Sequence, residues 1–300
     1  MNETTVPRSR AASFGWVGIA YLVALAVAAA WLWWGPTTDR LWLDALIADI
    51  IGTLVIFAFS RAFGNSSFYD AYWSVVPPLL LIYWWAAGDV GIDAVHCWLV
   101  AAVVGVWAVR LTANWAISFP GLHHEDWRYP LLRGRAGRAE VVADLGGIHL
   151  VPTLQVFLGM LPVYVAVTHD SVELAWLAGI AAAVGFSAVA LEYVADAQLR
   201  AFSRDRRPGQ VMDHGLWSWS RHPNYFGEFA FWCALALFGV ATVPGDAWWL
   251  FIGAVAMLAM FLGASIPMME DRSLERRPDY QGVVDRVPKF VPRPPRRVSA

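Results

Sequence analysis

The stretch that decides the fold class is WVGIAYLVALAVAAAWLWW, from Trp16 to Trp34. It carries no charged residue, and a helix needs roughly 20 mostly apolar residues to cross the hydrocarbon core of a bilayer. Arg8 and Arg10 precede it, so a cleaved signal peptide is an alternative interpretation. Because Trp31 to Trp34 extend the run to spanning length and further apolar runs follow, we interpret it as the first membrane span.

The composition of the whole chain indicates the same class. Of its 300 residues, 58% are hydrophobic and only 15% are charged, and the mean hydropathy is +0.48. The 18 tryptophans fit a protein with many boundaries between lipid and water, where indole rings accumulate. We therefore predict an all-α, polytopic transmembrane bundle of seven or eight spans in a lipid bilayer, and we expect no nucleic-acid partner.

Eight apolar runs can be placed along the chain as spans. They cover residues 14 to 35, 42 to 63, 71 to 87, 93 to 118, 147 to 168, 172 to 197, 225 to 243 and 247 to 268. A single membrane domain, residues 1–300, is the simplest organisation, and it ends in a basic tail, residues 293–300.

The basic residues lie mostly on one side of this topology. If the first span starts inside, the outer connections are residues 36 to 41, 88 to 92, 169 to 171 and 244 to 246, and Arg40 is their only Lys or Arg. The positive-inside rule then places both termini in the cytoplasm, and we expect the membrane to be a bacterial cytoplasmic membrane. Five ionisable residues fall near the inner ends of their spans: Arg110, Glu192, Asp196, Glu228 and Glu270. Such residues are functional candidates, although each alone could extend to the surface instead.

Polar residues are densest between residues 192 and 228. Basic side chains follow the acidic end of one span at Arg200, Arg204, Arg206 and Arg207, and the run SRHPNYFGE covers residues 220–228. Guanidinium groups suit phosphate oxygens, and a helix that starts at Pro223 offers free N–H groups to an anion. A ligand with several phosphates and hydroxyls fits best. The segment has no glycine-rich fingerprint of the G-x-G-x-x-G kind, which excludes a soluble dinucleotide-binding domain as the host.

These segments are similar to those of a known family. The likeness rests on Asp196-x-Gln198, GLW at 215–217, SRHPNYFGE at 220–228, the late Glu270, Tyr280, Pro288, Phe290 and Pro292, and upstream on Asn114-Trp115 and EDWRY at 125–129. Over roughly residues 60 to 292 the chain resembles the largely uncharacterised, mostly bacterial branch of the steroid 5-alpha-reductase superfamily. The resemblance implies a helical bundle with NADPH at its cytosolic side and a lipid substrate deeper in the membrane. Residues 1–146 would then form the substrate side, and residues 147–292 the cofactor-binding part.

The resemblance also implies a set of cofactor-binding residues. Asn224 and Glu228 match the cofactor-binding Asn and Glu of the family, and Asp196 resembles its Asp on the preceding helix. Where those enzymes carry Asn four residues before this Asp, the chain has Glu192. The full set of predicted cofactor-binding residues is Asp196, Gln198, Arg200, Arg204, Arg221, His222, Asn224, Tyr225, Glu228, Arg272 and Tyr280.

The catalytic residues are less clearly marked. The family uses an amino-terminal Glu and Tyr near the substrate carbonyl, and neither aligns with a residue of this chain. We select Tyr69 and Asp70, because they lie at the predicted cytoplasmic start of the third span. A tyrosine there could donate a proton as a hydride reaches the beta-carbon of an enone. An aromatic belt at the membrane interface is the alternative interpretation.

The predicted activity is the NADPH-dependent reduction of a carbon–carbon double bond in a lipophilic enone, such as a steroid or an isoprenoid lipid. Isoprenylcysteine and phospholipid methyltransferases share the Arg-His-Pro-x-Tyr segment and bind S-adenosylmethionine, so they are the alternative. The many arginines favour NADPH, since S-adenosylmethionine has no phosphates. A transporter or lipid-binding scaffold is a third interpretation. His123 and His124 have no third ligand spaced to join them, so we expect no metal site. The sequence leaves the oligomeric state open.

Overall fold

The computed structural model describes residues 9–294, which form helices and connections without a strand. Residues 1–8 and 295–300 lie outside the described range, and with them Arg8 and most of the predicted basic tail. The first half contains α1 (Arg10–Trp34), α2 (Leu41–Phe63), α3 (Tyr72–Ala87), α4 (Val95–Ser118), α5 (Arg128–Ala136) and α6 (Glu140–Ala143). The second half contains α7 (Val151–Val167), α8 (Ala175–Asp205), α9 (Pro223–Thr242), α10 (Ala247–Leu250), α11 (Ile252–Met260), α12 (Ile266–Arg276) and α13 (Tyr280–Arg286).

Seven helical stretches of the described residues are long and apolar enough to cross a membrane, which confirms the predicted polytopic bundle. The predicted span 71 to 87 corresponds to α3, which is not among the seven. Its 16 residues reach only about 24 Å at roughly 1.5 Å per residue, less than the ~30 Å of the hydrocarbon core.

Two spans were predicted to end too early. α8 continues beyond residue 197 to Asp205, and the last span continues beyond residue 268 through a π-helical turn, Phe261–Ser265, to Arg276. The apolar signal stops before these helices do, because their final turns are charged and hydrophilic. The 31 residues of α8 extend over about 46 Å, so the helix is longer than a bilayer core is thick.

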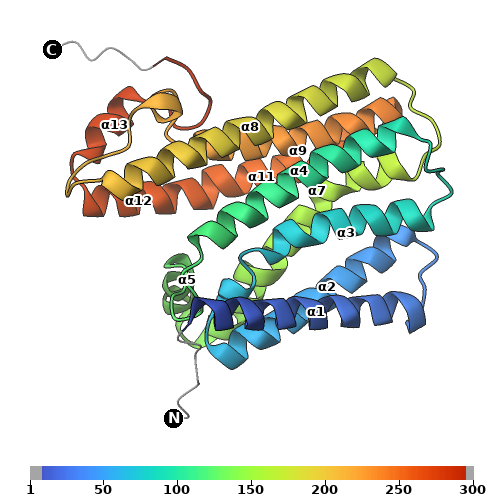
Figure 1. Cartoon of the computed structure of the whole chain (residues 1–300), viewed down its shortest axis with the longest axis horizontal. Coiled ribbons are helices and arrows are strands. Elements are labelled where there is room, and N and C mark those ends of the chain that lie inside the picture. The colour runs from blue at the N-terminus through green and yellow to red at the C-terminus, as the bar shows by residue number, and fades with distance from the viewer. Residues whose placement is uncertain (1–8, 295–300) are drawn as a thin grey trace.

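The helices run back and forth between two ends that differ in their connections (Figure 1). The short connections, residues 35–40, 88–94, 168–174 and 243–246, lie at one end, and Arg40 is their only Lys or Arg. The long connections, α5, α6, α12 and α13 gather at the other end, which we call the basic end (left in Figure 1). The arginines of the connections are therefore concentrated at one end of the bundle.

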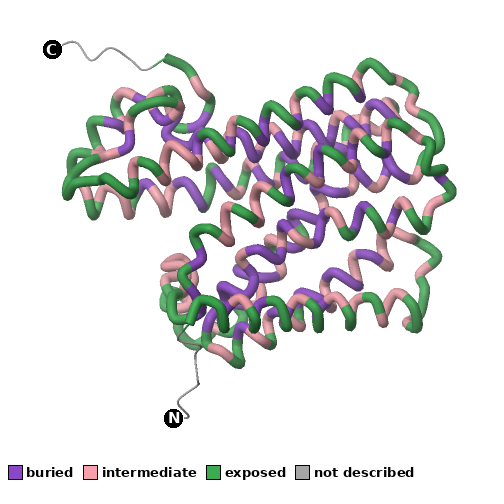
Figure 2. Tube along the Cα trace, viewed as in Figure 1, coloured by how far each residue is buried: buried purple, intermediate pink, exposed green. Residues whose placement is uncertain are grey.

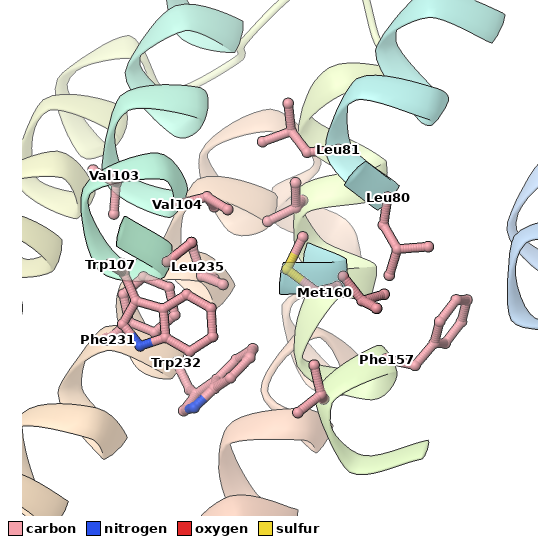
Figure 3. Packing of buried hydrophobic residues seen from close by; sticks show 14 of the residues in the cluster. Leu80, Leu81, Val103, Val104, Trp107, Phe157, Met160, Phe231, Trp232 and Leu235 are labelled. Carbon is pink, nitrogen blue, oxygen red and sulfur yellow. The ribbon is translucent and has the colours of Figure 1, made fainter. Parts of the chain in front are cut away.

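Buried residues line the inner faces of the helices, while α1 presents much of its surface outward (Figure 2). The centre of the bundle packs α3, α4, α7 and α9 together around large aromatic and aliphatic side chains (Figure 3). Trp107 stacks on Phe231 with ring centres 4.6 Å apart. Gly227 lets α9 approach α8 closely, because a Cβ at this position would lie 2.5 Å from Glu192 Cγ. This approach sets the position of the acidic residues of α8 next to α9.

Candidate functional site

Four charged side chains, which we call the charge cluster, meet where α4, α8 and α9 come together towards the basic end. Arg110 of α4 donates from Nη1 to Asp196 Oδ2 at 3.1 Å and from Nη2 to Glu192 Oε2. The same Nη2 lies 3.7 Å from Glu228 Oε2 on α9. The structure thus brings together three predicted intramembrane acids and the one predicted intramembrane arginine of α4.

An amide and two indoles orient the carboxylates of the charge cluster. Trp107 Nε1 donates to Glu228 Oε2 at 3.1 Å, and Trp232 Nε1 donates to Glu228 Oε1 at 2.9 Å. Asn224 Nδ2 donates to Asp196 Oδ1 at 3.1 Å. Both indoles belong to the packed core of Figure 3, so the hydrophobic packing also determines where Glu228 lies.

The charge cluster is acidic overall. Three carboxylates share the guanidinium of Arg110, and the next cation, Arg200, lies one turn after Asp196 on α8 and donates to Asn114 Oδ1. An ionic site buried at membrane depth is costly to form, and an excess of one sign of charge makes it more so. Proteins usually retain such an arrangement for function rather than for stability.

The connection between α4 and α5 carries a second ion pair into the same region. Arg128 Nε and the backbone N–H of Arg128 each donate to Asp126 Oδ1 at 2.9 Å. Burial raises the pKa of Asp126, but the bonds from Arg128 outweigh it and hold the pKa below its usual value. The charges of both residues act on Tyr225 of α9 and on Asp70. This pair therefore lies between the amino-terminal helices and α9.

The other predicted cofactor residues lie along the basic end. Arg272 of α12 lies over the ring of Trp127, with its Cζ 3.9 Å from the ring centre, a cation–π contact. Arg204 is exposed on the last turn of α8. Tyr280 begins α13, and burial raises its pKa to about 12. Within residues 9–294, none of these three side chains forms a hydrogen bond or salt bridge with the charge cluster.

Arg221 and His222 hold the carboxyl-terminal segment in place. Arg221 donates from Nε to Glu270 Oε1 at 2.6 Å and from Nη1 to the carbonyls of Val284 and Val287 at 3.0 and 2.7 Å. His222 Nε2 lies 3.1 Å from the same Glu270 oxygen. Burial lowers the pKa of His222, against the hydrogen bond that the imidazole donates to Glu270, which raises it. The contacts indicate a structural use for Arg221, while its predicted role in binding a cofactor stays a prediction.

Gln198 also has a structural partner. Its Oε1 accepts a hydrogen bond from the backbone N–H of Leu216 at 2.9 Å. Gly215, at a φ of +60°, permits this contact, because a Cβ there would lie 2.5 Å from Gln198 Oε1. The Gly-Leu-Trp motif at 215–217 is therefore a turn that is hydrogen-bonded to Gln198 of α8.

The two predicted catalytic residues, Asp70 and Tyr69, form hydrogen bonds with different groups of residues. Asp70 Oδ1 accepts a hydrogen bond from Tyr129 Oη at 2.5 Å and lies near the Asp126–Arg128 pair. Burial raises the pKa of Asp70 to about 7, although the bond from Tyr129 lowers it. Tyr69 instead lies 2.8 Å, hydroxyl to hydroxyl, from Thr153. Neighbours in sequence thus belong to two separate polar sites.

Tyr69 is part of a deep polar cluster among α1, α2, α3 and α7. Its members are Tyr21, Asp49, Thr53, Tyr69, Tyr72 and Thr153. The hydroxyls of Thr53 and Thr153 are 2.9 Å apart. Gly52 makes room for Tyr72, because a Cβ there would lie 2.3 Å from Tyr72 Oη.

Asp49 is the functional candidate that sequence reasoning missed. It is buried, and its Oδ1 has no hydrogen-bond partner among the described residues, as is also true of Tyr21 Oη. Within residues 9–294, it forms no salt bridge. An acid inside an apolar run is itself a signal of function, and the run from 42 to 63 contains it. His123 and His124, by contrast, are exposed.

The fold and the buried ionic sites define a polytopic helical membrane protein with a polar site at one end of the bundle. A family model described as a protein of unknown function, DUF1295, matches residues 56–287, so the chain belongs to this family. It is also 26% identical over 275 residues to an uncharacterised protein of Schizosaccharomyces pombe, an alignment that covers 83% of this chain and 78% of that protein. No solved structure matches the chain significantly.

Proposed function

We propose that this protein is a membrane reductase of the steroid 5-alpha-reductase superfamily, which uses NADPH to reduce a carbon–carbon double bond in a lipophilic enone. The observation that carries the proposal is that Asp196 and Glu228 meet at Arg110, with Asn224 hydrogen-bonded to Asp196. These are three of the residues for which the resemblance implies contact with the cofactor.

The side chains present suit the chemical groups of NADPH. Asp196 and Glu228 can accept from ribose or amide donors, and Asn224 can donate and accept. Arg200, Arg204 and Arg272 at the basic end form no salt bridge within residues 9–294, so their guanidinium groups can pair with phosphates. When bound, NADPH supplies a hydride.

The deep polar cluster supports a second part of the proposal, the delivery of a proton. Reduction of an enone requires a proton donor as well as a hydride source. Asp49, with a free oxygen and no cation beside it, can hold a proton, and Tyr72 and Tyr69 lie next to it. A substrate carbonyl in this apolar setting would find hydroxyl and carboxyl donors. Asp70, at the other polar site, is then free to orient Tyr129 and the α4–α5 connection.

One observation favours the alternative, an S-adenosylmethionine-dependent lipid or isoprenylcysteine-type methyltransferase. The charge cluster holds more carboxylates than guanidinium groups, and a sulfonium ligand would offset that excess. The arginines at the basic end that form no salt bridge within residues 9–294 still favour a phosphate-bearing ligand, so the reductase remains our proposal.

We also infer the orientation in the membrane. The concentration of Arg in the connections of the basic end supports a cytoplasmic location for that end. A cytoplasmic dinucleotide would then reach the charge cluster from its own compartment.

Thermal unfolding of the purified protein in detergent micelles tests the proposal, with NADPH, NADH and S-adenosylmethionine added separately. NADPH should raise the melting temperature, and Asn224→Ala should reduce the rise, because it removes the amide that donates to Asp196 of the charge cluster. Gln281→Ala, which changes an exposed amide of α13, is the matched control and should leave the rise intact. Stabilisation by S-adenosylmethionine alone would refute the reductase and favour the methyltransferase.

A further inference from the structure

The charge cluster contains two buried polar atoms that have no partner. Arg110 Nε and Glu192 Oε1 both lack a hydrogen bond within the described residues. Their side chains are 8% and 2% exposed, so solvent on the outer surface does not satisfy them. Both atoms belong to residues whose other polar atoms are bonded: Arg110 uses Nη1 and Nη2, and Glu192 uses Oε2.

An unpartnered buried polar atom costs free energy, and two of them in one ion pair are not retained for stability. One atom is an N–H donor and the other is a carboxyl oxygen, so a single ligand group that offers one acceptor and one donor satisfies both. A primary carboxamide has this combination, because its C=O accepts and its NH₂ donates. An ammonium group would leave Arg110 Nε unsatisfied.

The surroundings also select against an acidic ligand group. Asp196 and Glu228 contact the same guanidinium as Glu192, and Trp107 and Asn224 already donate to them. A ligand carboxylate would add negative charge to a site that already has more carboxylates than guanidinium groups. A neutral amide adds no charge and can satisfy both free atoms.

We propose that Arg110 and Glu192 bind the primary carboxamide of a nicotinamide ring, Arg110 Nε donating to its oxygen and Glu192 Oε1 accepting from its NH₂. This inference rests on the proposed function, and it assigns the nicotinamide end of the cofactor to the charge cluster. It also gives a role to Glu192, where the sequence departs from the resembling enzymes. The arginines of the basic end are left for the phosphates.

The test compares the binding of two dinucleotides that differ only in this group. Oxidised NADP and nicotinic acid adenine dinucleotide phosphate, which carries a carboxylate in place of the carboxamide, are titrated calorimetrically into the purified protein. The wild-type protein should bind the amide form at least about tenfold more tightly, which corresponds to the loss of one hydrogen bond to a charged group. Glu192→Gln, which removes the negative charge at nearly constant volume, should reduce this ratio to within about threefold.

Glu173→Gln is the matched control, because Glu173 is exposed in the connection before α8 and should leave the ratio unchanged. Equal binding of the two dinucleotides by the wild-type protein would overturn the inference and leave NADPH binding intact. If Glu192→Gln, with its fold verified by circular dichroism, kept the wild-type ratio of the two affinities, the inference would also be overturned. Failure of both dinucleotides to bind would refute the proposed function itself, and this inference with it.

Discussion

Replacing Asp70 by Asn should flatten the dependence of stability on pH near neutrality. Burial raises the pKa of Asp70 from 3.8 to about 7, which the hydrogen bond from Tyr129 only partly opposes. In the folded protein this carboxyl therefore keeps its proton at pH values where the unfolded chain has lost it. Its stabilising contribution is complete below the unfolded pKa and is lost as the pH rises through the folded pKa.

The magnitude follows from the difference between the two pKa values. The difference between about 7 and 3.8 corresponds to roughly 4 kcal/mol at about 1.36 kcal/mol per pKa unit. This is an upper limit, because Asp70 keeps part of its surface accessible. At roughly 2–4 °C per kcal/mol, the wild-type melting temperature should fall by on the order of 5–10 °C between pH 5 and pH 8 through this residue.

The measurement is thermal unfolding in detergent micelles from pH 5 to pH 8. Asp70→Asn keeps an oxygen that accepts from Tyr129 and stays neutral, so its melting temperature should be nearly independent of pH in this range. Asp285→Asn is the matched control, because it makes the same exchange at an exposed carboxylate of α13 that does not act on Asp70. It should leave the slope of the curve as in the wild type. A slope in Asp70→Asn as steep as in the wild type would refute the reasoning.

Three further predictions concern the tail, the helix packing and the deep polar cluster. Arg221→Ala should free the carboxyl-terminal segment and accelerate tryptic cleavage after Lys289 by about 10- to 100-fold, and an unchanged rate would show that other contacts hold the tail. Gly253→Ala should destabilise the bundle by about 1–3 kcal/mol in thermal unfolding, because its Cβ would lie 2.3 Å from backbone atoms of α7. Gly263→Ala, with open space at that position, should be close to neutral. Asp49→Asn should melt no lower than the wild type yet lose enone reduction, and a large loss of stability would mean that this acid supports the fold.

The sequence alone predicted most of the fold. Runs of apolar residues such as Trp16 to Trp34 identify spans because crossing a bilayer depends on a local property, hydrophobicity summed over about 20 residues. The same signal overestimated α3, whose 16 residues are short for a span, and lost the charged ends of α8 and α12. Length and charge at the helix ends depend on neighbouring segments, which a window of sequence does not contain.

The candidate site was predicted in part. Asp196, Asn224 and Glu228 were selected from the sequence and do meet, because α8 and α9 are consecutive and pack closely at Gly227. Arg110, which pairs with these acids, lies on α4, some 80 residues before Asp196 in the chain. No local sequence pattern predicts this pairing. Gln198 and Arg221 were predicted to bind the cofactor. In the structure Gln198 contacts a backbone group of the turn at 215–217, and Arg221 contacts Glu270 and backbone groups of the tail.

The sequence by itself determined that this is a membrane bundle with its arginines at one end, since both properties are sums over residues that are neighbours in the chain. Only the tertiary structure decided which charged side chains share a site, that Tyr69 and Asp70 serve different clusters, and that Asp49 lies buried without a cation. The physical reason is that the burial and hydrogen-bond partners of a side chain depend on which helix faces meet. Those contacts join residues far apart in the sequence.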